Sequence, residues 1–275
     1  MRDDLFGPGE SALVIGHRGA AGAAPENTLP AIRHAVRVEA DAVEIDVRAT
    51  RDDRIVLLHD ATVDRTTDGS GPVAEMELDE LRRLDAGRGF APGGSGERPF
   101  RGKGVMVPTL EEALEAAESL PVVVDVKSDR AGRLLERWLE RYPAATRVLV
   151  GGFRRSAVDR PAARARWRCA TEDELRPYVV AGKLGLAGPF VPDSNAVMVP
   201  ERRGILRIVP GRFVRRAHRD GLGVHVWTVN RPDRMRALLD LDVDGLISDA
   251  PGRARRILEE RAAAGGPPAR RPASS

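Results

Sequence analysis

The stretch PVVVDVKSDRAGRLLERW, residues 121–138, decides the fold. Its first part, Pro121–Val126, is apolar on both faces, as expected of a strand buried between two layers of side chains. Its second part, Ala131–Trp138, repeats apolar residues at helical spacing, which predicts a helix with one buried face. A buried strand followed by such a helix is the repeating unit of a parallel α/β fold.

The same alternation of short apolar runs and helical patterns continues along the 275 residues. Eight or nine strands alternating with helices predict an α/β protein with a single (β/α)8 TIM-type barrel, a fold that commonly occupies about 250 residues. The other predicted strands are Ala12–Ile15, Ala42–Val47, Ile55–Leu58, Arg147–Val150, Ala196–Val199, Val224–Val229 and Gly245–Ile247, and the weakest signals lie at Ala196–Val199 and around Trp167–Ala170. The other predicted helices are Leu29–Val38, Thr109–Ala117, Phe213–His218, Asp233–Leu239 and Arg253–Leu258.

We expect one barrel domain over residues 10–262 with a short inserted loop region. Residues Ala86–Gly104 contain seven glycines and two prolines, so they are predicted to form a long loop that partly covers the barrel mouth. After Glu260 the sequence consists of Ala, Gly, Pro and Arg, apart from two final serines. Residues 263–275 are therefore expected to be a disordered tail.

The composition excludes several classes of function. Forty-four Lys and Arg face 41 Asp and Glu, for a net charge of +3, and aromatic residues make up only 4%. This balance argues against nucleic-acid binding, which needs a cationic stripe interleaved with aromatics. No apolar run resembles a signal peptide or a bilayer span, and Cys169 is the only cysteine. We expect a cytoplasmic protein without stable membrane insertion, in which Cys169 is a core residue; the sequence leaves the oligomeric state open.

Acidic residues at the ends of two predicted strands indicate a metal site. In Val43-Glu44-Ile45-Asp46-Val47 the alternation sends Glu44 and Asp46 to one face and aliphatic residues to the other. Two carboxylates inside a barrel repel each other unless protons or a cation neutralise them, so a hard divalent cation is the economical explanation. Asp125 and Lys127 share one face of the next buried strand; they could be a ligand and a phosphate contact, or an internal ion pair.

Histidines follow two other strands. Gly16-His17-Arg18-Gly19 ends the first strand, and the arginine offers a planar set of donors suited to phosphate. His59-Asp60 follows Ile55–Leu58, and the midpoint between Asp46 and His59 falls between Asp52 and Asp53. A tight turn there would place His59 opposite Asp46 in an antiparallel hairpin. A parallel return would still bring it to the same mouth.

The remaining histidines, His34, His218 and His225, are assigned non-catalytic roles. Downstream of Pro25-Glu26, Asn27 or Thr28 can cap the following helix, and Pro30 suits its first turn.

Seven blocks, in this order, resemble the glycerophosphodiester phosphodiesterase family from about Val14 to Pro251. They are His17-Arg18-Gly19, Pro25-Glu26-Asn27-Thr28, Glu44-Ile45-Asp46-Val47, His59-Asp60, Pro108-Thr109-Leu110-Glu111-Glu112, Trp227-Thr228-Val229-Asn230 and Ser248-Asp249-Ala250-Pro251. The resemblance implies a divalent cation, Mg²⁺ or Ca²⁺, held by the carboxylates that match Glu44, Asp46 and Asp125. It implies His17 and His59 as the acid–base pair, and Arg18 and Lys127 as phosphate ligands.

The chain departs from the family pattern at three positions. Asp125 stands where the family usually has Glu, which leaves the metal's identity and affinity open. The family's Ser-Phe pair is Gly152-Phe153 here, and Ser248 replaces the usual Thr. Phe153 is expected to contact substrate.

We therefore expect a metal-dependent phosphodiesterase that acts on a small glycerophosphodiester and releases glycerol 3-phosphate and an alcohol. In this mechanism one histidine deprotonates the attacking oxygen and His59 protonates the leaving alkoxide. The attacking oxygen is either water or the glycerol 2-hydroxyl, which would give a cyclic phosphate. Trp227 is either an apolar wall for the glycerol part or a core residue. The alternatives are a lysophospholipase D-like or cyclic-phosphate-forming lyase activity, and a barrel that binds phosphodiesters without turnover.

Overall fold

Eight parallel strands form a nearly closed barrel in the computed structural model, which describes residues 4–94, 96–142, 146–184, 190–204 and 206–268. The strands are β1 (Leu13–Gly16), β2 (Ala42–Ala49), β4 (Val122–Val126), β5 (Val148–Gly151), β6 (Trp167–Arg168), β7 (Ala196–Pro200), β10 (Gly223–Trp227) and β11 (Gly245–Ser248). They are hydrogen-bonded in the order β6-β5-β4-β2-β1-β11-β10-β7. Between the two end strands, β6 and β7, a parallel bridge joins Cys169 to Ala196. The predicted fold class is confirmed.

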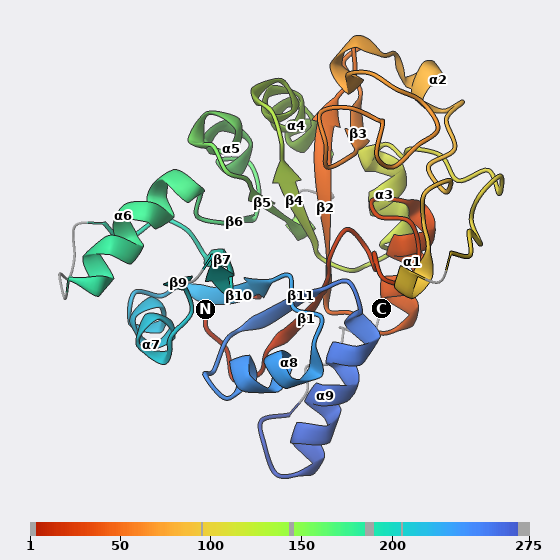
Figure 1. Ribbon diagram of the computed structural model, residues 1–275. Helices are drawn as coiled ribbons and strands as arrows, with labels where there is room; N and C mark the ends of the chain where they lie inside the picture. The colour runs from red at the N-terminus through yellow and green to blue at the C-terminus, as the bar shows by residue number, and fades with distance from the viewer. Residues whose placement is uncertain (1–3, 95, 143–145, 185–189, 205, 269–275) are drawn as a thin grey trace.

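Helices surround the barrel, and Figure 1 shows them around the sheet. They are α1 (Leu29–Arg37), α3 (Leu110–Ala116), α4 (Asp129–Arg141), α5 (Arg155–Ala162), α6 (Glu172–Lys183), α7 (Gly211–Arg219), α8 (Pro232–Leu239) and α9 (Pro251–Ala263). Helices α5 and α6 were not predicted from the sequence. Each contains an internal proline, Pro161 or Pro177, and proline is read as a helix breaker because it lacks the N–H donor.

The segment between β2 and α3 forms a side unit with its own small core. It contains β3 (Ile55–Leu57), η1 (Val73–Glu75), α2 (Leu78–Leu81) and η2 (Pro92–Gly94). Its buried cluster includes Val63, Leu81 and Val105. Residues Ala86–Gly104 lie beside the barrel, beyond α1 and α3, and do not cross its centre (Figure 1). The loop that was expected to cover the mouth partly lies at its side instead, because the apolar cluster of the side unit holds this loop against β3.

The predicted strand Ile55–Leu58 is not one of the barrel strands. The corresponding β3 pairs antiparallel with β2, with Val47 opposite Leu57 and Ala49 opposite Ile55. Of the two arrangements that the sequence left open, the structure has the antiparallel hairpin. Its register differs by one residue from that of a tight turn centred between Asp52 and Asp53, because the connection from Thr50 to Arg54 is longer than a two-residue turn. Leu58 donates its backbone N–H to Asp46, and His59 lies one position further on.

The end of the barrel away from the catalytic motifs is filled by apolar side chains. Phe6 is fully buried, 5.2 Å from the ring of Trp167 and 5.7 Å from that of His225. His225 bonds through Nε2 to the carbonyl of Phe6 at 2.9 Å. Cys169 is buried in the same interior cluster, and burial raises the pKa of its thiol to about 12. This end of the barrel is therefore closed mainly by apolar packing, and the predicted metal and acid–base residues lie at the other end.

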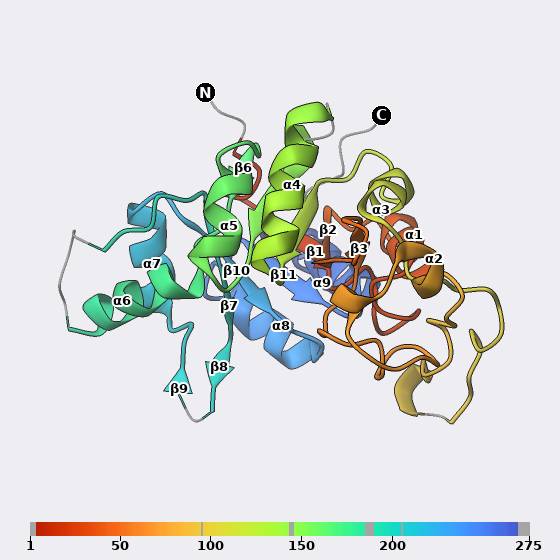
Figure 2. The same cartoon turned by 90° about the horizontal axis from the view of Figure 1, so that it is seen from above.

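A short two-stranded hairpin follows β7. The short hairpin of β8 (Arg202–Arg203) and β9 (Leu206–Arg207) projects away from the barrel on the side opposite the N-terminus (Figure 2). Within the described residues, no helix is both long and apolar enough to cross a membrane. Helix α9 extends to Ala263, and of the expected tail, residues 269–275 lie outside the described part of the chain.

Candidate active site

The register between β2 and β4 brings the predicted metal ligands together. Asp46 is the Cα partner of Asp125, and Glu44 is the partner of Val123. Because side chains alternate between the two faces of a strand, Glu44, Asp46 and Asp125 all point into the barrel. The sequence predicted this shared face within each strand, and the parallel pairing joins the two strands.

Each of the three carboxylates offers an oxygen, and these oxygens lie within 4.8 Å of one another. Glu44 is 7% exposed and Asp46 is 1% exposed. Burial, with the neighbouring charge of Asp46, raises the pKa of Glu44 to about 7. Burial also raises the pKa of Asp125, although Lys127 opposes this shift. Without a further cation, the group therefore tends to hold a proton.

Two cations and an amide hold Asp46 in the ionised state. Lys127 Nζ lies 2.7 Å from Oδ1, and Arg18 Nε lies 3.2 Å from Oδ2. The amide of Asn27 donates to Oδ2 at 2.7 Å. Burial alone would raise the pKa of Asp46, but Lys127 and Arg18 lower it. Lys127 also lies 2.7 Å from Asp125 Oδ2, so the ion pair that the sequence left open exists.

The donor set fits a hard divalent cation. All three candidate ligands offer carboxylate oxygens, which Mg²⁺ and Ca²⁺ prefer. Asp125 Oδ1 is buried and has no hydrogen-bond partner among the described residues, so one ligand atom is available without breaking a contact. Asp125 thus reaches the other two carboxylates despite being one methylene shorter than Glu.

His17 is held by a carboxylate that the sequence analysis did not assign. Its Nδ1 lies 2.6 Å from Asp249 Oδ1, directly after β11, and Asn230 donates to the other oxygen at 2.6 Å. Burial lowers the pKa of His17, but the hydrogen bond to Asp249 and the charge of Glu44 outweigh it, so the pKa is raised. This arrangement leaves Nε2 as the ring nitrogen available to a substrate.

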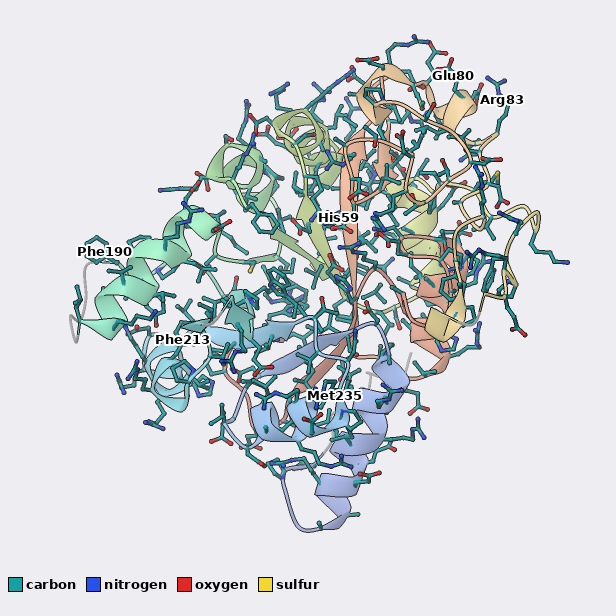
Figure 3. The ribbon with its side chains drawn as sticks, viewed as in Figure 1. His59, Glu80, Arg83, Phe190, Phe213 and Met235 are labelled. Carbon is teal, nitrogen blue, oxygen red and sulfur yellow. The ribbon has the colours of Figure 1, made fainter. Side chains whose placement is uncertain are left out.

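His59 has a parallel arrangement on the other side of the acidic group. Its Nδ1 lies 2.7 Å from Asp60 Oδ1, and Arg65 Nε donates to Asp60 Oδ2 at 2.5 Å. Figure 3 labels His59 at the mouth, near β2 and β4. The hydrogen bond from Arg65 is the main cause that lowers the pKa of Asp60 to about 2, so Asp60 stays charged at neutral pH.

An ionic chain joins the surroundings of the two histidines. Arg65 donates to both oxygens of Glu26, at 2.7 and 2.8 Å. Glu26 also accepts from Arg18 Nη1 at 2.6 Å, and Arg18 reaches Asp46. The chain therefore orients Arg18 from one side and Asp60 from the other.

Asp249, Glu26 and Arg65 were not predicted as site residues from the sequence. The first two lie in quoted motifs, but no local pattern says which histidine or arginine they contact. Asn27 was considered as a helix cap, whereas its amide holds Asp46; Thr28 occupies the cap position of α1, and its hydroxyl donates to the carbonyl of Pro25.

The two predicted apolar contacts lie on different walls of the mouth. Phe153 follows β5 and is 45% exposed, with Lys127 Nζ 5.4 Å from its ring centroid. Trp227 ends β10, is partly buried and packs on the interior cluster. Since β10 and β5 lie far apart in the strand order, the two aromatic side chains flank the acidic group from different sides.

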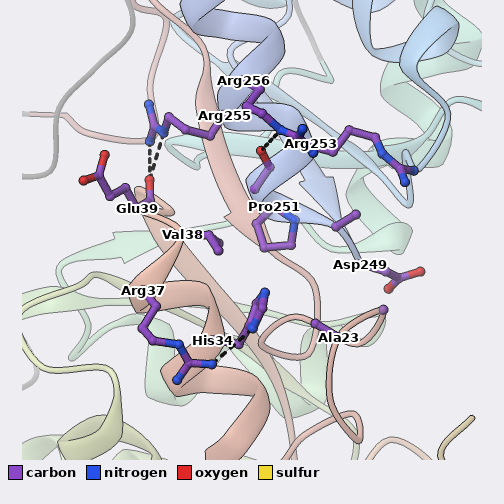
Figure 4. Close-up of a pocket in the computed structure, with 13 residues that line it drawn as sticks. Ala23, His34, Arg37, Val38, Glu39, Asp249, Pro251, Arg253, Arg255 and Arg256 are labelled. Atoms are coloured by element: carbon purple, nitrogen blue, oxygen red, sulfur yellow. Dashed lines mark hydrogen bonds between the residues drawn. The ribbon is translucent and has the colours of Figure 1, made fainter. Parts of the chain in front are cut away.

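Of the two cavities that stand out, the larger is not the predicted site. It has a volume of about 450 Å³ and lies outside the barrel, between the end of α1 and the start of α9 (Figure 4). His34, Arg37 and Arg256 line it, and Asp249 is the only member of the histidine pairs that it contacts. The other, of about 270 Å³, is lined by His59 and Lys127 and lies at the mouth itself.

The raised pKa of Glu44 predicts a pH-dependent stability of the metal-free protein. Since the folded-state pKa is about 7 against an ordinary 4.5, the folded state binds more protons between these values. Stability is therefore lost as pH rises across this window, by about 3 kcal/mol. Urea unfolding from pH 4 to 8 in chelator should show this fall in the wild type and a smaller one in Glu44→Gln, which keeps the raised pKa of Asp125. Parallel curves for the two proteins would contradict the prediction.

The barrel and its mouth define a TIM-barrel phosphodiesterase. The profile of the Glycerophosphoryl diester phosphodiesterase family matches residues 17–253, and the chain belongs to this family. It is 30% identical over 250 residues to a glycerophosphodiester phosphodiesterase of Caldanaerobacter subterraneus, covering 87% of this chain and 94% of the relative.

Solved structures agree on the fold. The glycerophosphoryl diester phosphodiesterase domain of a Mycobacterium tuberculosis protein superposes with a TM-score of 0.79 at 22% identity, covering 90% of this chain and 98% of the other. An Oleispira antarctica phosphodiesterase, solved with the product sn-glycerol-3-phosphate, gives a TM-score of 0.72 at 24% identity, with 90% and 97% covered.

Proposed function

We propose that the protein hydrolyses glycerophosphodiesters to glycerol 3-phosphate and an alcohol at this mouth. The observation that carries the proposal is the group of three carboxylates, with oxygens within 4.8 Å, close to two histidines that each bind a carboxylate through Nδ1. Family membership supports the reaction. The product bound to the Oleispira antarctica enzyme supports glycerol 3-phosphate as the phosphate-bearing product.

Glu44, Asp46 and Asp125 would hold a divalent cation, Mg²⁺ or Ca²⁺. When bound, the cation supplies positive charge that neutralises the phosphodiester and the developing negative charge. Lys127 contacts two of the three carboxylates. Its ammonium would present its remaining donor capacity to a phosphoryl oxygen.

Arg18 is the second phosphate ligand in this proposal. Its backbone N–H donates to Glu44 at 2.8 Å, and its guanidinium spans Glu26 and Asp46. These contacts fix the planar donor set beside the carboxylate group. An arginine held in this way can bind phosphate oxygens without losing much side-chain entropy on binding.

The two histidines carry out the two proton transfers of the reaction. His17 takes the proton of the attacking oxygen, and the imidazolium that forms is stabilised by the carboxylate of Asp249. His59 gives a proton to the leaving alkoxide from Nε2, because its Nδ1 is engaged by Asp60. Trp227 and Phe153 supply apolar walls on either side of the reacting phosphate.

Product analysis by phosphorus NMR tests the proposal. With glycerophosphoglycerol and Mg²⁺ or Ca²⁺, we expect the diester resonance to be replaced by that of glycerol 3-phosphate. A five-membered cyclic phosphate that accumulates first would assign the attack to the glycerol 2-hydroxyl. A cyclic phosphate as the final product would instead establish a lyase, and binding without any new resonance would establish a phosphodiester-binding barrel.

A further inference from the structure

A cavity of about 270 Å³ lies next to the proposed acid His59 and extends outward along β4 and the start of α5. This volume lies just below the usual range of small-molecule sites, about 300–1,000 Å³, which suits one compact group. The lining side chains are Arg48, His59, Val126, Lys127, Phe153, Arg154 and Ala157. We call this space the head-group cavity.

The proposed chemistry determines which part of the substrate enters this cavity. His59 protonates the leaving oxygen, so the alcohol attached to that oxygen must lie beside His59. Trp227 ends β10, which is separated from β4 by three strands in the sheet order. The glycerol part therefore lies toward Trp227 and the leaving alcohol toward the head-group cavity.

The charged side chains that line the head-group cavity are cationic, and the carboxylates that act on Arg48, those of Asp46, Asp60 and Asp125, lie outside its lining. Its lining contains three cationic side chains and no carboxylate. Lys127 is already paired with Asp46 and Asp125. Among the described residues Arg48 and Arg154 form no ion pair, and Arg48 is fixed by donating from Nε and Nη2 to the carbonyl of His59 at 3.0 and 2.6 Å.

A cationic alcohol such as choline finds no partner here. Its usual neutral partner is an aromatic face, but Lys127 Nζ already lies 5.4 Å from the ring centroid of Phe153. Both guanidinium groups would repel a second cation in this space. An anionic group, in contrast, would meet the free donors of Arg48 and the exposed guanidinium of Arg154.

We infer that the enzyme prefers glycerophosphodiesters whose leaving alcohol carries a negative charge, such as a phosphorylated polyol, and that Arg48 and Arg154 determine this preference. The inference rests on the proposed function, because it assigns the leaving alcohol to the cavity beside His59.

Specificity constants for three substrates test the inference. They are glycerophosphocholine, glycerophosphoglycerol and glycerophosphoglycerol with a terminal phosphomonoester, compared by kcat/KM at 20 mM and 300 mM NaCl. At low salt we expect the anionic substrate to exceed the cationic one by about tenfold or more, and salt to narrow the gap. Equal constants, or a preference for the choline ester, would overturn the inference while leaving the proposed hydrolysis intact. Failure to cleave any of the three would overturn the proposed function itself.

Variants assign the preference to the cavity. Arg154→Gln should lower the ratio of anionic to neutral kcat/KM about threefold, as for an exposed charge. Arg48→Gln should lower it about tenfold, since this side chain is half-buried and fixed. Arg154→Glu, an exposed change that does not endanger folding, should favour the choline ester.

The matched control is Arg155→Gln, because Arg155 is adjacent, paired with Asp159 and outside the lining. A ratio that moves equally in the control, or in none of the variants, would contradict the assignment.

Discussion

Replacing His59 or His17 by alanine should lower kcat on glycerophosphoglycerol by about 10²–10⁴-fold with saturating metal, the usual contribution of general acid–base catalysis. Each imidazole bonds a carboxylate through Nδ1 and leaves Nε2 for the proton transfer. The loss should appear mainly in kcat, since neither histidine is proposed to hold the phosphate. Steady-state kinetics of each single variant measures the change in kcat and in KM.

His34→Ala is the matched control. His34 lies on α1, contacts Arg37 at 3.2 Å and lines the larger outer cavity, so its removal should leave kcat within a factor of two or so. A substrate with a good leaving group, such as a nitrophenyl phosphodiester, separates the roles. It needs no acid, so it should restore much of the activity of His59→Ala and little of His17→Ala. Near-full activity of either variant on the natural diester would refute the proposed roles.

Removing the cation should abolish turnover, with a loss of at least about 10³-fold, because the phosphodiester would then face three carboxylates. The expected sequence is inactivation by EDTA followed by recovery with Mg²⁺ or Ca²⁺. Calorimetric titration of the chelated protein with each metal alone should show one site. Asp125→Asn should weaken metal binding, since Asp125 provides the unpartnered oxygen Oδ1.

Asp53→Asn is the control for the metal site. Asp53 is exposed, lies in the β2–β3 connection and pairs with Arg130, so its loss should not affect metal binding. Asp125→Glu restores the residue usual in the family and keeps the charge. If chelation leaves turnover unchanged, or if Asp125→Asn binds metal as the wild type does, the acidic group is not the metal site.

The motifs at strand ends made much of the site predictable. Glu44 and Asp46 share a face because side chains alternate along a strand, and a TIM-type barrel places the ends of all its strands at one mouth. Local spacing also allowed the antiparallel hairpin of β2 and β3. Spacing alone could not give its register, which differs by one residue from the pairing of His59 with Asp46. A connection of five residues can close in more than one register, and the register that forms depends on how β3 packs within the side unit.

The helices α5 and α6 were missed for a different reason. Their prolines, Pro161 and Pro177, weaken the local helical signal, whereas packing on the barrel supplies the stabilisation that the sequence pattern does not display. Helix stability in a protein comes mostly from such packing. The partners of the histidines were missed in the same way, since Asp249 is 232 residues from His17.

The sequence by itself determined the α/β barrel class and the shared face of Glu44 and Asp46, because periodicity is a local property of the chain, and the ordered motifs pointed to His17 and His59 through the family resemblance. Only the tertiary structure decided that Asp46 pairs with Asp125, that Lys127 lies between them, and that Arg48 and Arg154 face one cavity. These relations depend on strand register and on the closure of the barrel. Such contacts between distant segments arise when the whole apolar core packs, so no short stretch of sequence encodes them.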